Sequence, residues 1–179
     1  MRIISGSLKG RRISPPKNLP VRPTTDRAKE ALFNILSHQY DFNGCAVLDL
    51  YTGTGAISYE FASRGVAAVT AVDQHAACIR FVQQTAEKLK LCITTLKSPV
   101  LKFLLSANGS TYDFIFADPP YAYRKDEYES LIDNIISKGI LTKNGLIIIE
   151  HAPQIDLSEL TSFRTARNYG GCVFSFFEQ

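Results

Sequence analysis

The run whose residue types most clearly suit catalysis is Asp118-Pro119-Pro120-Tyr121, which directly follows the apolar stretch 112–117. An exocyclic amino nitrogen of a nucleobase is a poor nucleophile, because its lone pair is delocalised into the ring. A carboxylate and a peptide carbonyl that accept its hydrogens would favour a tetrahedral nitrogen with an available lone pair. Prolines fix the backbone and lack an N–H, and an aromatic ring can stack on an extruded base. The run predicts a site that orients a base amino group, although a capped Pro-Pro turn would have the same residues.

A second run, 49–55, places Gly53 and Gly55 directly after another short apolar stretch that ends with Asp49 and Leu50. Glycines there let a ligand approach the backbone, and they also serve a tight turn between a strand and a helix. The dinucleotide fingerprint needs a further glycine where this chain has Ser58, so a pyrophosphate is disfavoured. Asp73 follows the glycine turn by about twenty residues, the sequence separation at which a carboxylate binds ribose hydroxyls in such folds. Alternatively, Asp73 caps the next helix. The two features together predict a ligand that contains adenosine without a diphosphate.

Other chemistries lack their motifs. No H-E-x-x-H run and no Cys/His spacing indicates a metal site, so no metal is expected. The glycines are not followed by Gly-Lys-Ser/Thr, and the chain has no G-x-S-x-G run, which argues against a nucleoside triphosphatase and a serine hydrolase. His38, His75 and His151 are far apart in the sequence, and each is expected at the surface or at a helix end.

These runs can act together only if strands and helices bring them to one edge of a sheet. From residue 46 onward, short stretches that are apolar on both faces alternate with stretches of helical spacing, a pattern typical of a parallel sheet covered on both sides. We therefore expect an α/β fold with a Rossmann-like, doubly wound sheet of about seven strands, the last one antiparallel. The expected strands are 46–50, 68–72, 92–96, 112–117, 145–150, 163–167 and 172–177, and the expected helices are 26–37, 56–63, 75–90, 100–105 and 126–138.

Positive charge gathers at the N-terminus. Residues 1–30 carry eight basic and two acidic side chains, whereas residues 31–179 carry twelve and fifteen. The stretches 2–5 and 11–14 flank a glycine-containing turn and predict a small β-hairpin, and four prolines between 15 and 23 predict a stiff connector. The charge fits an anionic polymer as partner, or a solubilising tail. We expect one domain over 1–179, with the hairpin and connector at 1–24 and the main body at 25–179.

The composition limits the class of protein. Hydrophobic residues make up 45% and charged residues 21%, which supplies a packed core and excludes wholesale disorder. No apolar run has the length of a membrane helix or of a signal peptide. The four cysteines have no C-x-x-C spacing, which fits reduced thiols rather than a disulfide scaffold. A cytoplasmic protein without membrane contact is expected.

The motifs resemble those of the S-adenosylmethionine-dependent amino-methyltransferases, in which Asp-Pro-Pro-Tyr follows a fourth strand and Asp-x-x-x-Gly-x-Gly a first. Within that class, the opening 1–6 (MRIISG), the turn 9–11 (KGR) and the run 22–34 (RPTTDR to LFN) resemble the RsmD family, and the similarity extends to about Glu178. The N-terminal block is specific to this family, whereas Asp-Pro-Pro-Tyr is shared with N6-adenine enzymes. The resemblance implies a class I methyltransferase fold and methylation of guanine N2 in small-subunit (16S) ribosomal RNA.

The resemblance also implies roles for single positions. The methyl donor, S-adenosylmethionine, would be held at its amino-acid end and at its ribose by Asp49, Gly53, Gly55 and Asp73. The guanine amino group and ring would contact Asp118, Pro119, Pro120 and Tyr121. Thr25 and Arg27 would lie near the donor or the entering nucleotide. A basic set would bind RNA phosphates: Arg2, Lys9, Arg11, Arg12 and Arg22.

One departure from the family concerns the adenine of the donor. Many relatives place an Asp after the third strand that accepts the adenine amino hydrogens, and this chain has Ser98 there. A hydroxyl can also accept a hydrogen bond, so Ser98 is the candidate for that contact. The expected partner is ribosomal RNA, by itself or within an assembling small ribosomal subunit, and the expected state is a monomer.

Three other functions stay open. An N6-adenine DNA methyltransferase would share every site residue, but it would normally add a target-recognition region. A protein glutamine methyltransferase would favour Asn over Asp at position 118. A non-catalytic RNA-binding module would need only the basic hairpin, and it would not bind S-adenosylmethionine.

Overall fold

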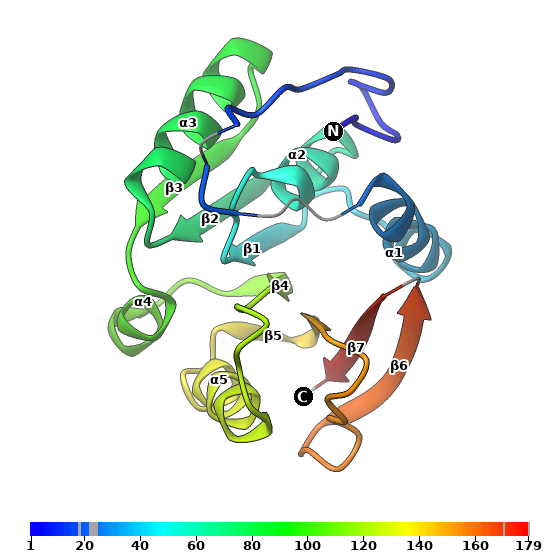
Figure 1. Cartoon of the computed structure of the whole chain (residues 1–179), viewed down its shortest axis with the longest axis vertical. Helices are drawn as coiled ribbons and strands as arrows, with labels where there is room; N and C mark the ends of the chain where they lie inside the picture. The colour runs from blue at the N-terminus through cyan, green and yellow to red at the C-terminus, as the bar shows by residue number, and fades with distance from the viewer. Residues whose placement is uncertain (18, 22–24, 170, 179) are drawn as a thin grey trace.

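The computed structural model describes residues 1–17, 19–21, 25–169 and 171–178 (Figure 1). Its helices are α1 (Asp26–Gln39), α2 (Ala56–Ser63), α3 (Ala76–Leu89), α4 (Val100–Ser106) and α5 (Lys125–Ser137). Its strands are β1 (Ala46–Leu50), β2 (Ala68–Asp73), β3 (Ile93–Lys97), β4 (Tyr112–Ala117), β5 (Leu141–His151), β6 (Phe163–Tyr169) and β7 (Cys172–Glu178). The predicted alternation is confirmed, and the predicted bounds of β1, α2 and β4 match residue for residue.

The seven strands form one sheet in the order β3-β2-β1-β4-β5-β7-β6. Strands β1 to β5 pair in parallel, whereas β7 runs antiparallel to both β5 and β6. The order along the chain reverses between β1 and β4, and ligands of such sheets bind at the carboxyl ends of the strands beside this point. The predicted doubly wound sheet with a reversed last strand is confirmed.

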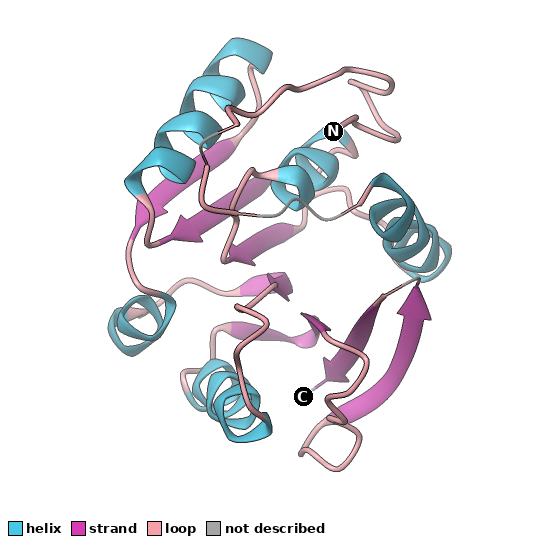
Figure 2. Ribbon diagram, viewed as in Figure 1, coloured by secondary structure: helices cyan, strands magenta, loops and turns pink. Residues whose placement is uncertain are grey.

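Helices cover both faces of the sheet (Figure 2). Phe33 of α1 and Phe61 of α2 share one apolar cluster with Phe114 of β4. The neighbouring strand residue, Ile115, belongs to a second cluster on the opposite face, together with Leu131 of α5. Successive strand side chains point to opposite faces, so a strand covered on both sides is mostly apolar. This is why β1, β4 and the second half of β5 are mostly apolar in the sequence, with acidic side chains only at Asp49, Asp113 and Glu150.

The N-terminal hairpin is present, with its two arms paired through one isolated bridge. Arg2 and Arg12 form that antiparallel bridge, and the Ile3 N–H donates to the Arg11 carbonyl at 3.0 Å. Ile3 is buried in a third apolar cluster with Tyr59 of α2. Figure 1 shows the segment lying beside α2. The hairpin is therefore a docked part of the surface.

Glu60 of α2 holds this hairpin. Its carboxylate is fully buried and accepts hydrogen bonds from the backbone N–H groups of Ile4, at 2.8 Å, and Ser5, at 3.0 Å. Lys29 of α1 and Arg64 lie 3.5 and 3.0 Å from the same carboxylate. A buried charge is tolerated when it is both paired and hydrogen-bonded. Through the Glu60 carboxylate, these two cations and two N–H groups fix the hairpin against α1 and α2.

Some sequence predictions differ from the structure. β5 begins at Leu141, before the predicted start at Gly145, because Leu141 pairs with Tyr112 across a register shift. His151 is buried, and its Nε2 lies 2.8 Å from Ser175 Oγ, so the prediction of a surface or helix-end position is wrong for it. His151 is the last residue of β5, where it pairs with Val173 of β7. Among the described residues, none of the helices has the length and apolar character needed to cross a membrane.

Candidate functional site

A cavity of about 260 Å³ opens at the carboxyl ends of β1, β2 and β4. Parallel strands deliver the ends of these three elements to the same edge of the sheet, as the sequence predicts. Its wall includes seven of the residues singled out in the sequence: Asp49, Gly53, Asp73, Asp118, Pro119, Pro120 and Tyr121. The run 49–55, Asp73 and the run 118–121 therefore border the same cavity.

Two glycines shape the turn after β1, with φ of 53° at Gly53 and 79° at Gly55. Gly53 lines the cavity, whereas Gly55 lies behind it at the N-cap of α2. A β-carbon at Gly55 would lie 2.7 Å from the ring of Tyr59, so this position requires glycine for the turn itself. Gly53 is the glycine that borders the ligand space, and the predicted ligand contact of Gly55 is not supported by the cavity lining.

Asp49 is buried in the cavity wall, with 1% of its surface exposed. Its Oδ2 accepts hydrogen bonds from the hydroxyl of Thr52, at 2.7 Å, and from the N–H and hydroxyl of Ser58. Burial raises the pKa of Asp49 to about 6, and the negative charge of Asp73 adds to the rise, against these hydrogen bonds. A carboxylate in this desolvated position gains stability from a cationic ligand.

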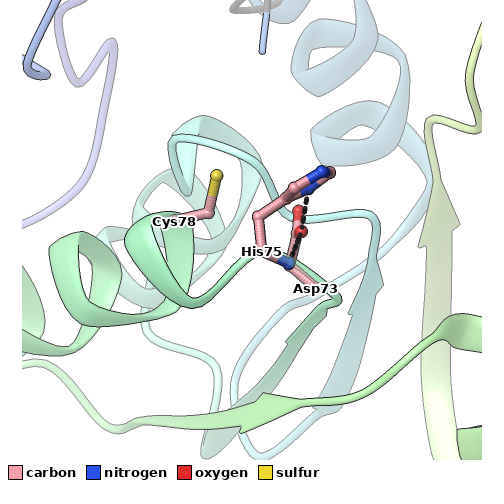
Figure 3. A group of neighbouring side chains, drawn as sticks. All are labelled: Asp73, His75 and Cys78. Carbon is pink, nitrogen blue, oxygen red and sulfur yellow. Dashed lines mark hydrogen bonds and ion pairs between the residues drawn. The ribbon is translucent and has the colours of Figure 1, made fainter. Parts of the chain in front are cut away.

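Asp73 ends β2 and lies beside His75 and Cys78 (Figure 3). Its Oδ2 accepts the Gly53 N–H at 2.9 Å, and its Oδ1 accepts the His75 N–H at 2.8 Å and lies 2.9 Å from His75 Nδ1. Cys78 completes a group whose ligand atoms lie within 4.8 Å of one another, a donor set that suits zinc. Both Asp73 oxygens already accept backbone hydrogen bonds, so the arrangement fits a carboxylate that braces the turn. The three residues lie close in the sequence, at 73, 75 and 78, but this spacing is not one of the H-E-x-x-H or C-x-x-C patterns that indicate a metal site.

Asp118 follows β4 directly, and its backbone N–H donates to the Leu50 carbonyl at 3.4 Å. Burial raises the pKa of the Asp118 carboxyl, and the negative charges of Glu150 and Asp49 raise it further. Three carboxylates thus come from the ends of β1, β4 and β5. Their mutual repulsion favours a positively charged ligand between or beside them.

The loop after Asp118 is held by a turn. The Pro120 carbonyl accepts the Tyr123 N–H at 2.9 Å, so this carbonyl is already used within the protein. Pro119 is buried in the cavity wall, and its carbonyl is the better candidate acceptor. Tyr121 has 56% of its surface exposed and also lines the cavity, which suits a ring that stacks on an entering base.

Three predicted residues lie away from the cavity lining. Thr25 caps α1 with its hydroxyl, Arg27 is exposed on that helix, and neither lines the cavity. The Ser98 N–H donates to the Asp73 carbonyl at 3.0 Å, but Ser98 does not line the cavity either. The donor contacts of these three residues stay predictions without support from the cavity lining. Arg22, predicted to bind RNA, falls outside the described residues.

The cavity also contains residues that sequence reasoning missed. Tyr51 lies in the wall with φ of 62°, a conformation that residues with a side chain rarely adopt. Pro20 and Val21 of the N-terminal connector contribute to the wall as well, and Val21 lies against Gly53. Their position depends on how the connector crosses the glycine turn, which has no sequence signal.

The basic hairpin and the cavity belong to the same stretch of chain. Arg2, Lys9, Arg11 and Arg12 are all exposed on the hairpin. The connector then leads from the hairpin to Pro20 in the cavity wall. A polyanion bound along the hairpin would therefore lie on a segment that is continuous with the site.

Known proteins share this fold and sequence. The family model "Conserved hypothetical protein 95" matches residues 1–178. "Putative rRNA methyltransferase YlbH" of Bacillus subtilis (strain 168) is 32% identical over 163 residues, which cover 89% of this chain and 86% of that protein. "Ribosomal RNA small subunit methyltransferase D" of Escherichia coli (strain K12) is 31% identical over 150 residues, which cover 84% and 74%.

Among solved structures, "Putative methyltransferase yhhF from Escherichia coli" superposes with a TM-score of 0.86 at 28% identity, and the match covers 100% of this chain and 97% of that one. The sheet order and this likeness identify the class I methyltransferase fold. The chain therefore belongs to the RsmD family of S-adenosylmethionine-dependent methyltransferases, the family described as conserved hypothetical protein 95.

Proposed function

We propose that this protein transfers a methyl group from S-adenosylmethionine to the N2 amino nitrogen of a guanine in small-subunit ribosomal RNA. The observation that carries the proposal is the meeting of Asp49, Asp73 and Asp118 at one cavity. The names of the relatives support ribosomal RNA as the substrate class. The resemblance of the N-terminal block to the RsmD family supports guanine. The protein acts in the cytoplasm as a monomer of one domain, on RNA by itself or in an assembling subunit.

The donor carries an ammonium group, a sulfonium and two ribose hydroxyls, and the cavity offers carboxylates for the ammonium and for the hydroxyls. Asp49, desolvated and next to a second negative charge, receives the ammonium. Gly53 lets the amino-acid end approach the backbone. Asp73 accepts the ribose hydroxyls, since a carboxylate has about four acceptor positions and the backbone N–H groups of Gly53 and His75 take two of them.

The acceptor side of the site lies after β4. One oxygen of Asp118 and the Pro119 carbonyl accept the two hydrogens of the guanine amino group, and Tyr121 stacks on the ring. The raised pKa of Asp118 reflects burial and the charges of Glu150 and Asp49. A sulfonium bound beside these carboxylates favours the ionised form of Asp118, which is the form that accepts hydrogens.

The transfer is an in-line displacement. The lone pair of the amino nitrogen forms the new N–C bond while the C–S bond breaks, and the sulfur keeps the bonding electrons as a neutral thioether. The nitrogen then loses one proton to water or to Asp118. No charged leaving group needs stabilisation, so most of the rate gain comes from holding the two reactants in attack geometry.

The test is Asp118→Ala, compared with wild type and with Asp133→Ala, an exposed residue of α5. Transfer of a tritiated methyl group to small-subunit RNA should be lost in Asp118→Ala and kept in Asp133→Ala, while calorimetry shows donor binding in all three. Nuclease digestion and mass spectrometry should place the methyl group on guanine N2. Retained transfer by Asp118→Ala contradicts the role of Asp118. Methylation of adenine in DNA, or an absence of donor binding to wild type, contradicts the function.

A further inference from the structure

We propose that Tyr51 and Tyr123 form a clasp that positions the acceptor loop 118–124 against the glycine turn 51–55. This inference rests on the proposed function, because it concerns the alignment of a donor held by one segment with an acceptor held by the other. Neither tyrosine is needed for an electronic step. Both are positioning residues, which act through the segments that carry Gly53 and Asp118.

The clasp is a direct contact between the two segments. The hydroxyl oxygens of Tyr51 and Tyr123 lie 2.9 Å apart, and their rings meet edge to face at a centroid distance of 6.1 Å. A backbone hydrogen bond from the Asp118 N–H to the Leu50 carbonyl, at 3.4 Å, also joins the two strand ends. A bond of 3.4 Å is at the weak end of the range, so the hydroxyl pair is the better connection.

Each tyrosine is anchored to its own segment. Tyr123 donates its N–H to the Pro120 carbonyl at 2.9 Å, and its ring packs edge to face on Tyr128 of α5, which is fully buried. Tyr123 therefore connects the acceptor loop to the core. Tyr51 is the first residue of the glycine turn 51–55 and lines the cavity. The contact between the two hydroxyls therefore couples the position of the acceptor loop 118–124 to that of the glycine turn 51–55.

The backbone of Tyr51 supports a functional origin for the contact. Its φ of 62° lies in the left-handed region, which a residue with a side chain occupies at an energetic cost. This conformation starts the turn that leads to Gly53, and it coincides with the hydroxyl contact to the acceptor loop. Strained residues at a site persist when the surroundings hold them, and here Tyr123 is the partner that holds the side chain.

The test uses Tyr51→Phe, Tyr123→Phe and the double variant, each of which keeps the ring and removes a hydroxyl. Tyr112→Phe is the matched control, because Tyr112 is a buried tyrosine of β4 whose hydroxyl contacts Thr70 at 3.4 Å. The single-turnover rate at saturating donor and RNA should fall roughly tenfold or more in each single variant, since small misalignments reduce attack rates steeply. The donor Kd should change less than about twofold, because the donor-binding groups stay intact. The double variant should be no slower than the slower single variant, as expected for a shared contact.

A second readout does not depend on the RNA substrate. Amide hydrogen exchange of the backbone N–H groups at 121–124 should accelerate in Tyr51→Phe and Tyr123→Phe, and should stay unchanged in Tyr112→Phe. Unchanged exchange and unchanged rates contradict the clasp. A rate loss in Tyr51→Phe without one in Tyr123→Phe also contradicts it, because that result indicates direct contact of Tyr51 with a reactant. If wild type lacks RNA methylation, the proposed function fails, and the exchange experiment still decides whether the clasp exists.

Discussion

The cavity concentrates negative charge where a cationic donor would lie. Asp49 and Asp73 line it together with Asp118, and Glu150 is close enough to raise the pKa of Asp118. Placing carboxylates in a desolvated cluster costs free energy in the absence of a cation. A donor with an ammonium and a sulfonium offsets that cost on binding. Part of the donor affinity therefore comes from relief of repulsion that the free protein carries.

The first prediction concerns the pH dependence of donor binding. The pKa of Asp49 in the free protein is about 6, and protonated Asp49 has no charge to pair with an ammonium. The affinity for S-adenosylmethionine should be constant above about pH 7 and fall by roughly tenfold at pH 5. Calorimetry across this range measures it. Asp49→Asn should bind the donor weakly and without this pH step, and a step of equal size in Asp49→Asn contradicts the assignment.

The same residue affects stability in the opposite direction. The pKa of Asp49 rises on folding, so its contribution to the free energy of unfolding is fully present below about pH 4 and is lost as pH rises through about 6. The shift from 3.8 to about 6 corresponds to about 3 kcal/mol. Asp49→Asn should therefore remove this loss in the free protein between pH 4 and 7, as measured by urea unfolding. If the free energy of unfolding of Asp49→Asn falls with pH as steeply as that of wild type, another group causes the loss of stability.

At the scale of elements, the contact between the hairpin and α2 decides whether the basic arm has a fixed place. Gly6 lies so close to α2 that a β-carbon there would be 1.8 Å from the Ser63 carbonyl oxygen. The Ser7 N–H donates to the same oxygen at 2.7 Å, and Glu60 holds Ile4. These contacts join two segments about 55 residues apart in the sequence. The hairpin thereby gains a fixed orientation that its single bridge alone would not give.

Gly6→Ala should therefore weaken RNA binding, while donor affinity stays within about twofold. The new methyl group has to push the hairpin away from α2, and a left-handed alanine adds roughly 1 kcal/mol of strain. Gly10→Ala is the matched control, because Gly10 has a similar φ of +81° and a β-carbon added there would meet no atom within 4 Å. Filter binding to small-subunit RNA should separate the two variants. Equal losses in both would show that backbone strain, and not docking, governs RNA affinity.

For the whole molecule, the distribution of charge matters more than its sum. The formal net charge is only +3, yet the first thirty residues carry a surplus of six positive charges over a negative remainder. The described basic side chains of the hairpin are exposed, and the connector leads from them to the cavity. A polyanion is therefore attracted to the N-terminal hairpin, from which the connector leads to the cavity.

This arrangement predicts a steep salt dependence of RNA binding. Each phosphate contact contributes about 0.7 to 0.9 to the slope of log K against log salt. Replacing Lys9, Arg11 and Arg12 by alanine should lower the slope by about 2 if each binds one phosphate. Lys102→Ala on α4, exposed and far along the chain from the hairpin, is the control and should leave the slope unchanged. A flat salt response of wild type contradicts the role of the basic arm.

The sequence by itself determined which chemistry this chain carries and most of its secondary structure. Asp118-Pro119-Pro120-Tyr121 and the turn after Asp49 are local patterns, and the apolar runs and glycine stops that set β1, α2 and β4 are local as well. Sheet topology then requires the strand ends to meet, which is why the central site residues were predictable together. The pairing of β6 with β7 was also predictable, because the two runs are close in the sequence and form a hairpin.

Only the tertiary structure decided which residues surround that chemistry. The clasp of Tyr51 and Tyr123, the burial of Glu60 under the hairpin and the approach of Val21 to Gly53 join segments that are far apart in the chain. The place of Ser98 outside the cavity was decided in the same way, whereas the helix cap formed by Thr25 is a local contact with the N–H of Ala28. The physical reason is that hydrophobic periodicity specifies the faces of an element, whereas hydrogen bonds between loops depend on the final packing of those elements.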